Sequence, residues 1–225
     1  MRKHLLQSAV IGVGILGLAA TAQADLTANA GVTTNYVFRG VTQTDDNPAI
    51  QGGIDYTHPS GFYAGAWGSN VKFPNAGGSA LEYDLYAGFN FEVAQDVKLD
   101  VGYITYNYTD STVNDNFSND EVFIGAKYQN FAAYYYNGNA KLSAYDHQYF
   151  DLRYTLALPQ DIKASLHYGH LDNNNAPDAD DIGIRFSKDI ASFNTSIAFT
   201  RVDPNSGDSQ NELFLTVTKE FDLMK

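Results

Sequence analysis

The sequence of 225 residues contains no cysteine, which excludes a disulfide framework and any metal or redox centre built on thiols. It is also poor in bases, because 14 Lys and Arg stand against 26 Asp and Glu, for a formal net charge of −12. We find no basic patch of the kind that binds nucleic acid, so no nucleic-acid partner is expected. The glycine pairs at 52–53 and 77–78 are not followed by a helical pattern and are not phosphate-binding loops.

Long hydrophobic runs are scarce, and the one that stands out lies at the start of the chain. A short basic stretch precedes an apolar run over residues 5–20, which leads to a small-x-small sequence ending at Ala24. This run is shorter than the about 20 residues of a spanning helix and is typical of a secretory signal peptide. We therefore predict that residues 1–24 are a signal peptide, cleaved between Ala24 and Asp25, and that residues 25–225 form one domain.

The rest of the chain alternates apolar with polar residues. From Leu26 to Arg39, even positions are apolar or aromatic and odd positions are mostly small or polar. This period of two is typical of a strand with one apolar face, so we predict a strand over residues 26–39. A polar loop over 42–48, a second alternating run from Ile50 and a short turn at 57–61 follow.

The same pattern recurs along the chain and predicts twelve strands in six hairpins, with long and short connections in strict alternation. The long connections are expected at 41–48, 74–79, 110–119, 138–146, 172–180 and 203–210, and the short ones at 58–61, 93–96, 129–130, 159–161 and 188–191. Short turns at one end and long loops at the other are typical of a membrane barrel. The faces of Phe62–Phe73 and Phe131–Tyr136 are ambiguous, which leaves the count open by two strands.

These features predict an all-β fold, a transmembrane antiparallel up-and-down β-barrel of about twelve strands in the bacterial outer membrane. The mean hydropathy of −0.29 is that of a soluble protein, but a barrel needs apolar residues only at alternate positions. The 16 Tyr and 14 Phe suit the aromatic girdles that such barrels carry at the two membrane interfaces. A soluble secreted β-protein remains the alternative fold.

A resemblance to a known family is concentrated at about residues 31–91, and the remainder agrees mainly in strand pattern and length. It rests on Asn35-Tyr36-Val37-Phe38-Arg39-Gly40, Gln43-Thr44-Asp45, Gln51-Gly52-Gly53-Ile54-Asp55-Tyr56 and Ser60-Gly61-Phe62-Tyr63-Ala64-Gly65-Ala66-Trp67-Gly68-Ser69-Asn70-Val71. These stretches resemble the TorF family of porins from the bacterial outer membrane. The resemblance implies an outer-membrane barrel of the porin type and says little about the transported solute.

Charged residues on the polar faces of the predicted strands are assigned to the barrel interior, because Lys or Arg facing lipid at mid-membrane costs about 2–4 kcal/mol each. The predicted lumen-lining residues are Arg39, Asp55, Glu82, Asp84, Lys98, Asp100, Glu121, Lys127, Asp151, Arg153, Lys163 and Arg185. Barrels of about 8 strands are filled by side chains, whereas 16–18 strands leave an open channel. Twelve strands are compatible with a narrow pore and with a mostly plugged interior.

We expect a porin-like channel for passive diffusion of small polar solutes or ions. A weak cation preference is expected, because the excess Asp residues cluster in the long loops and would enrich cations at the mouth. The alternative is a non-conducting barrel that acts as a structural or ligand-binding surface protein. Expected partners are outer-membrane lipid, the barrel-assembly machinery and the solutes themselves. No cofactor is expected, and the oligomeric state is left open.

Metal and enzyme chemistry are not predicted. The acidic segments 172–175 and 178–181 offer oxygen ligands, but neither has the spacing of a calcium loop. Hydrolysis would need a histidine beside a serine, or a pair of carboxylates, in a recognisable context. The candidates are His167 near Ser165, His170 with Asp172, and His147 with Asp146, and none lies in a nucleophile motif.

The assignment of faces can be tested at two neighbouring positions. Ile184 is predicted to face lipid and Gly183 to face the lumen. Ile184→Arg should therefore destabilise the assembled barrel by about 2–4 kcal/mol, while Gly183→Arg should only crowd the interior. The folded, heat-modifiable fraction of each variant after refolding into lipid measures this difference. Equal tolerance of the two substitutions would overturn the assignment.

Overall fold

In the computed structural model of the protein, residues 24–74, 78–138, 146–174 and 176–224 are described. Apart from Ala24, the predicted signal peptide lies outside these residues, so its cleavage before Asp25 stays a prediction. The described chain forms a closed antiparallel β-barrel, and the predicted count of twelve barrel strands is confirmed. The predicted all-β class therefore holds, with one short helix added.

The barrel strands run from 8 to 17 residues in length. They are β1 (Asp25–Thr33), β4 (Ala49–Thr57), β5 (Phe62–Phe73), β6 (Gly78–Ala94), β7 (Val97–Tyr108), β8 (Asn119–Tyr128), β9 (Phe131–Gly138), β10 (His147–Leu158), β11 (Ile162–Asn173), β12 (Ala179–Ile190), β13 (Phe193–Pro204) and β14 (Gln210–Asp222). A single 3₁₀ turn, η1 (Pro159–Asp161), joins β10 to β11.

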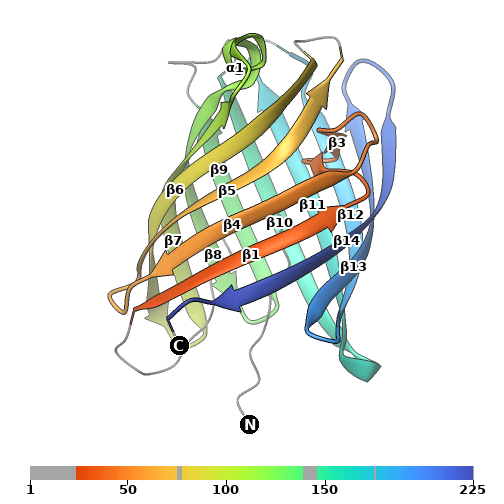
Figure 1. Ribbon diagram of the computed structural model, residues 1–225. Helices are drawn as coiled ribbons and strands as arrows, with labels where there is room; N and C mark the ends of the chain where they lie inside the picture. Colours follow the sequence, from red (N-terminus) through yellow and green to blue (C-terminus); the bar gives the residue numbers. More distant parts are fainter. Residues whose placement is uncertain (1–23, 75–77, 139–145, 175, 225) are drawn as a thin grey trace.

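Each barrel strand pairs with its neighbours in the chain, and β1 closes the ring by pairing with β14 in a register that places Thr27 opposite Asp222. The short turns join β4 to β5, β6 to β7, β8 to β9, β10 to β11 and β12 to β13. We call their end of the barrel the turn end and the opposite one the loop end. In Figure 1, β1 starts and β14 finishes at the turn end, while α1 and β3 lie at the loop end.

Exposure alternates along the barrel strands as the sequence predicts. Ile50 is 74% exposed on the outer face, while its neighbour Ala49 is 1% exposed on the inner face. The two ambiguous runs now have assigned faces, because Tyr63 and Trp67 in β5 and Tyr134 and Tyr136 in β9 are buried. Other exposed apolar residues on outer faces are Leu81, Leu85, Val122, Ile124, Ile182, Leu213 and Leu215. An apolar exterior of this kind is typical of a barrel that faces lipid.

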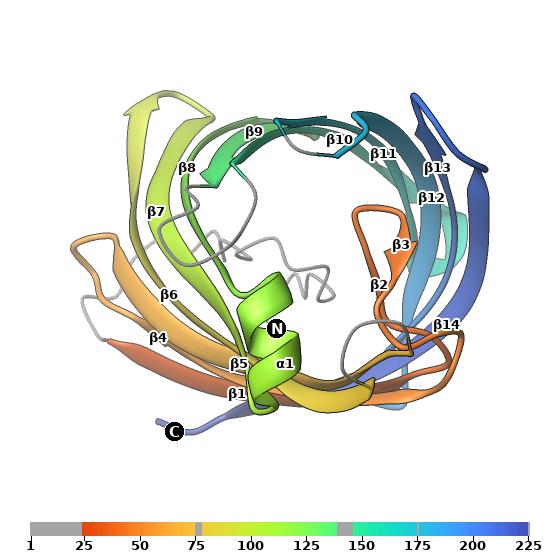
Figure 2. The same ribbon diagram turned by 90° about the horizontal axis from the view of Figure 1, so that it is seen from above.

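The predicted strand over residues 26–39 is wrong in its second half. β1 ends at Thr33, and the chain then turns into the barrel, where β2 (Val37–Phe38) and β3 (Val41–Thr42) form a small hairpin. Figure 2 shows this hairpin inside the ring of strands. The apolar alternation continues through Tyr36 and Phe38 because these rings pack against Trp67 and Tyr106 in the interior. An alternating pattern of apolar residues alone does not show whether their side chains face lipid or pack inside the barrel.

The polar stretch between β7 and β8 contains the helix α1 (Ser111–Phe117), which the sequence analysis did not predict. Asp110 caps it, because its side chain accepts hydrogen bonds from the backbone N–H groups of Thr112 and Val113. Val113 is fully buried in a cluster with Tyr36, so the helix covers part of the loop end. No helix in the described part of the chain has the length and apolarity needed to cross a membrane.

A comparison of Gly61 at the turn end with Gly78 at the loop end, two glycines with similar φ, tests how tightly the chain packs at Gly61. Gly61 has φ +93°, and a Cβ there would lie 2.0 Å from the carbonyl oxygen of Asn90, whereas Gly78 has φ +88° and open space around it. Both alanine variants should lose about 1–2 kcal/mol because of the positive φ, and Gly61→Ala should lose clearly more. Urea unfolding midpoints in detergent measure the difference. Equal losses would show that the close approach at Gly61 does not affect stability.

Candidate functional site

The inward segment, residues 34–48, occupies the interior near the loop end and is held there by Asn35. The Asn35 side-chain nitrogen donates to Asp46 and to Glu212, each at 2.9 Å. Its side-chain oxygen accepts hydrogen bonds from Thr42 at 2.7 Å and from Thr44 at 3.0 Å. Asn35 and Thr44 are both buried. The segment is therefore an integral part of the barrel interior.

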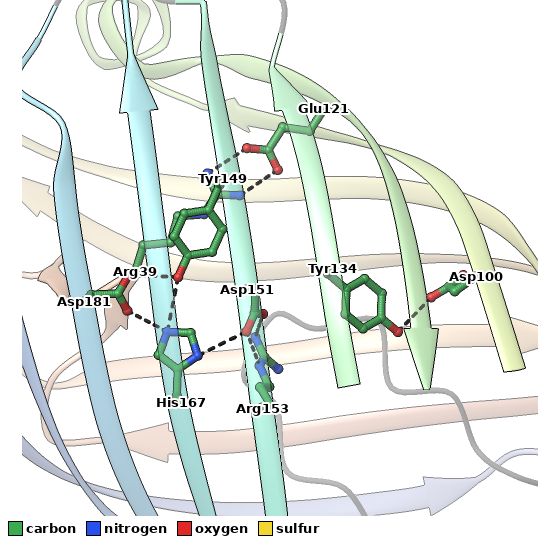
Figure 3. A network of polar contacts seen from close by, with 9 residues as sticks. All are labelled: Arg39, Asp100, Glu121, Tyr134, Tyr149, Asp151, Arg153, His167 and Asp181. Carbon is green, nitrogen blue, oxygen red and sulfur yellow. Dashed lines mark hydrogen bonds and ion pairs between the residues drawn. The ribbon is translucent and has the colours of Figure 1, made fainter. Parts of the chain in front are cut away.

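Arg39 lies at the tip of the β2–β3 hairpin. Arg39 and Gly40 have φ values of +49° and +79°, as a two-residue turn with positive φ at both central positions requires. The guanidinium makes two contacts with Glu121 on β8, at 2.8 Å and 2.9 Å, and its central carbon lies 4.1 Å from the ring centroid of Tyr149. His147 Nε2 also lies 2.6 Å from Glu121. These contacts join the hairpin tip to the wall formed by β8 and β10 (Figure 3).

His167 on β11 lies between two carboxylates. Its Nδ1 is 3.1 Å from Asp151 and its Nε2 is 2.6 Å from Asp181. Because ionised carboxylates only accept hydrogen bonds, this geometry is fully satisfied when both ring nitrogens carry a proton. Arg153 also contacts Asp151, at 2.5 Å, and the Tyr149 hydroxyl donates to Asp181 at 2.9 Å. Figure 3 shows this network beside the Arg39–Glu121 pair.

Tyrosines bind further acids on the inner wall. Asp100 is 1% exposed and accepts hydrogen bonds from the hydroxyls of Tyr63 at 2.8 Å and Tyr134 at 3.1 Å. Asp55 accepts a short hydrogen bond from Tyr86. A neutral hydroxyl donates a hydrogen bond to a carboxylate but brings no positive charge. The tyrosines therefore do not offset the negative charge of these acids when the acids are ionised.

Asp84 differs from the other buried acids. It is fully buried, and neither carboxylate oxygen has a hydrogen-bond partner among the described residues. Glu82 on the same face accepts a long hydrogen bond, 3.4 Å, from Tyr36. A buried carboxylate without a partner is strongly unfavourable, so Asp84 is stable there only when water or a proton satisfies it.

A cavity of about 460 Å³ opens between the inward segment and the turn end. It extends from Arg39 to Gln129 and Asn130 in the β8–β9 turn. The charged side chains that line it, counted among the described residues, are the bases Arg39, Lys127, Arg153, Lys163 and Arg185, the acids Asp151 and Asp181, and the titratable His167. The cavity is thus basic, although the whole chain carries a net charge of −12.

The twelve predicted lumen-lining residues fall into two groups. Six line the cavity, namely Arg39, Lys127, Asp151, Arg153, Lys163 and Arg185. The others lie on β4, β6, β7 and β8, where Glu82, Asp84, Asp100 and Glu121 are buried and Asp55 and Lys98 are half-buried. Arg39 reaches the interior from a hairpin tip and not from the predicted strand. Their role in conduction stays a prediction.

Sequence reasoning missed Asn35 and Tyr149 as organising residues. Tyr149 precedes Asp151 and Arg153 by even spacings on β10, so the alternation could have placed its ring inside. Its partners could not be found that way, because Asp181 and Arg39 belong to other strands and to the hairpin. Asn35 lies on the polar face of the strand predicted over residues 26–39, but alternation could not reveal its partners Asp46 and Glu212.

The histidine pairs considered from the sequence are arranged differently. His170 contacts Asp180 at 2.9 Å on the outside, and His147 contacts Glu121. Ser165 shares a 3.0 Å hydrogen bond with Thr155, while the His167 ring is held by its two acids. In the described ranges, no group of three or more His, Asp or Glu side chains is placed to hold a metal ion.

The fold and this interior define a class of protein, a closed β-barrel with an apolar exterior and a charged, partly filled interior. The model of a family described as bacterial protein of unknown function (Gcw_chp) matches residues 18–221. The chain belongs to this family. No curated protein sequence matches the chain.

Solved structures with the same fold include porins. The structure described as KdgM porin has a TM-score of 0.59 and 8% sequence identity, with 87% of this chain and 99% of that chain covered. The structure of KdgM porin in complex with disordered oligogalacturonate has a TM-score of 0.55 and 8% identity, with 88% and 99% covered. At such identity the likeness establishes the barrel fold.

Breaking the Arg39–Glu121 pair should strongly destabilise the barrel. Arg39→Ala leaves the fully buried Glu121 carboxylate without its main cation, and loss of one partner of a buried pair costs about 3–5 kcal/mol. The control Lys72→Ala breaks an exposed pair with Asp45, for which about 0–1 kcal/mol is expected. Urea unfolding midpoints in detergent compare the two variants. A similar small effect in both would mean that Glu121 finds water or a proton when Arg39 is removed.

Proposed function

We propose that the protein is a porin-like channel of the bacterial outer membrane, which allows passive diffusion of small polar solutes or ions. The main support is the charged cavity inside a closed barrel whose outer face is apolar. Such an exterior suits lipid, and a polar interior of this size suits water and small solutes.

The remaining proposals follow from the same assignment. Residues 1–24 act as an export signal, the barrel-assembly machinery inserts the mature chain, and the chain belongs with the TorF porins that its residues 31–91 resemble. The short turns then face the periplasm and the long loops face outward, as in other outer-membrane barrels. The exposed Phe221, one residue before the end of β14, lies on the apolar outer face near the turn end.

Ion preference depends on two zones of opposite charge. The acidic long loops support the cation preference expected from the sequence, because they enrich cations at the outer mouth. The cavity liners have the opposite balance, five bases against two acids among the described residues. Selectivity is set where the ion loses most of its water, so the mouth and the cavity make opposing contributions to it.

A second candidate function is a non-conducting barrel that binds ligands or supports the surface through its loops. It is favoured by the inward segment, which Asn35 and Arg39 hold inside the barrel. The two candidate functions differ in whether solutes can pass the β2–β3 hairpin while the hairpin stays in place. The two functions therefore make different predictions for current across a bilayer.

Single-channel recording of the refolded mature protein in a planar bilayer tests the proposal. Steady current steps in KCl are expected, and a salt gradient gives the sign of the ion preference. Correctly folded protein that stays silent would refute the channel and support the non-conducting barrel. Heat-modifiable mobility on gels verifies folding in each preparation.

The hairpin should limit the current. A Cβ at Gly40 would lie 2.8 Å from Val202 Cβ and 3.0 Å from Asp181 Cβ, so Gly40→Val should push the hairpin tip from the wall of β12 and β13 and raise the conductance. Gly207→Val is the control, because Gly207 also has positive φ but its nearest neighbour atom is 3.8 Å from the added Cβ. Equal conductance in both variants and the wild type would show that the hairpin is not the narrowest point.

A further inference from the structure

Four of the five basic side chains that line the cavity lie on β8, β10, β11 and β12. Lys127 on β8 and Arg153 on β10 both stand opposite Ala132 on β9, so the three positions form one row across the barrel wall. Arg185 on β12 stands opposite Ser165, which stands opposite Thr155 on β10. Between β8 and β12, these two neighbouring rows carry positive charge and no acid in register.

The acids of this cavity are already engaged by other groups. Asp151 is bound by Arg153 and His167, and Asp181 is bound by His167 and Tyr149. Neither acid forms an ion pair with Lys127 or Arg185, so the charges of these two bases are not neutralised by direct contact with Asp151 or Asp181.

Lys127 and Arg185 have no ion pair with an acidic side chain in the described part of the chain. Arg185 donates one hydrogen bond, to Ser196 at 2.8 Å, and its guanidinium lies 5.4 Å from the ring centroid of Phe214. Lys127 Nζ lies 6.0 Å from the ring centroid of Tyr134. A guanidinium has five N–H donors and an ammonium three, so most of these donors are available to a solute.

We propose that this cavity is a binding site for small anions that carry more than one carboxylate or phosphate group. Arg185 and Lys127 provide the contacts to the solute, and Arg153 and Lys163 add to the positive potential around it. The bound anion takes the place of water around these cations on the inner wall. It accepts charge-assisted hydrogen bonds from them, which are stronger than hydrogen bonds between neutral groups. The proposal rests on the proposed channel for its biological meaning, because the site then lies on the path of the solute.

Arg185 and Lys127 have different roles in this site. The planar fork of Arg185 suits two oxygens of one carboxylate or phosphate group, and Lys127 offers a point charge to a second group. A singly charged anion can engage only one of them at a time. Binding should therefore strengthen with the number of anionic groups, which separates this site from a general preference for anions.

Calorimetric titration of the refolded protein in zwitterionic detergent tests binding directly. Citrate should bind, while glucose, a neutral solute of similar size, should not. Arg185→Gln and Lys127→Gln should each weaken citrate binding about tenfold or more, because each removes one charge-assisted contact. Lys219→Gln is the control, since Lys219 lies beside Phe193 and Phe221, whose rings are exposed on the outer face. Acetate should bind more weakly than citrate.

Current recordings with citrate separate this inference from the channel proposal. A conducting wild-type channel should be blocked by citrate in the concentration range of the titration, and the block should weaken in Arg185→Gln. A conducting channel that citrate neither blocks nor binds would overturn the anion site and leave the channel proposal intact. A silent barrel that still binds citrate would overturn the channel and support the site.

Two further outcomes count against the inference. Unchanged citrate affinity in the folded variants Arg185→Gln and Lys127→Gln would place the anion elsewhere. An equal loss in Lys219→Gln would show that citrate responds to overall charge and not to this cavity. If either lumen variant fails to fold, the comparison of citrate with acetate on the wild-type protein still decides, because equal affinity for both contradicts a site with two cationic contacts.

Discussion

The constraint on which the rest of the structure depends is that a backbone inside a lipid layer must satisfy all of its hydrogen bonds internally. A closed ring of strands does this, and here β1 closes on β14 with no edge left within the ring. Closure also fixes the face of every side chain, because alternate residues must point inward. The inward-facing charges of the barrel strands therefore share one confined interior.

That confinement explains why charged side chains are so closely paired in the interior. Glu121 is bound by Arg39 and His147, and Asp151 by Arg153 and His167. A charge removed from bulk water without such partners would be strongly destabilising. The hairpin tip provides one of these partners, Arg39. The inward segment therefore neutralises Glu121 on the barrel wall and also fills part of the interior. Its position near the loop end leaves the cations near the turn end facing an open cavity.

Most of the fold could be predicted from the sequence, because an alternation of period two combined with sorted loop lengths is typical of a membrane barrel and of few folds besides. The twelve strands and their connections follow from it. The inward course of residues 34–48 could not be predicted, because Tyr36 and Phe38 continue the alternation while packing against interior rings. The charged residues could be assigned to the interior, but not their pairing. Arg39 and Glu121 lie 82 positions apart in the chain, and only the closed ring brings them together.

The distribution of charge matters more for function than its sum. The net charge of −12 suggests an acidic protein that attracts cations, and the long loops agree with that expectation. The cavity has the opposite sign, because its two acids are bound by neighbouring side chains while Lys127 and Arg185 form no ion pair with an acidic side chain among the described residues. In the proposed channel, a solute would meet these two zones in series. Its selection would then depend on a few cations placed by strand register, which composition cannot reveal.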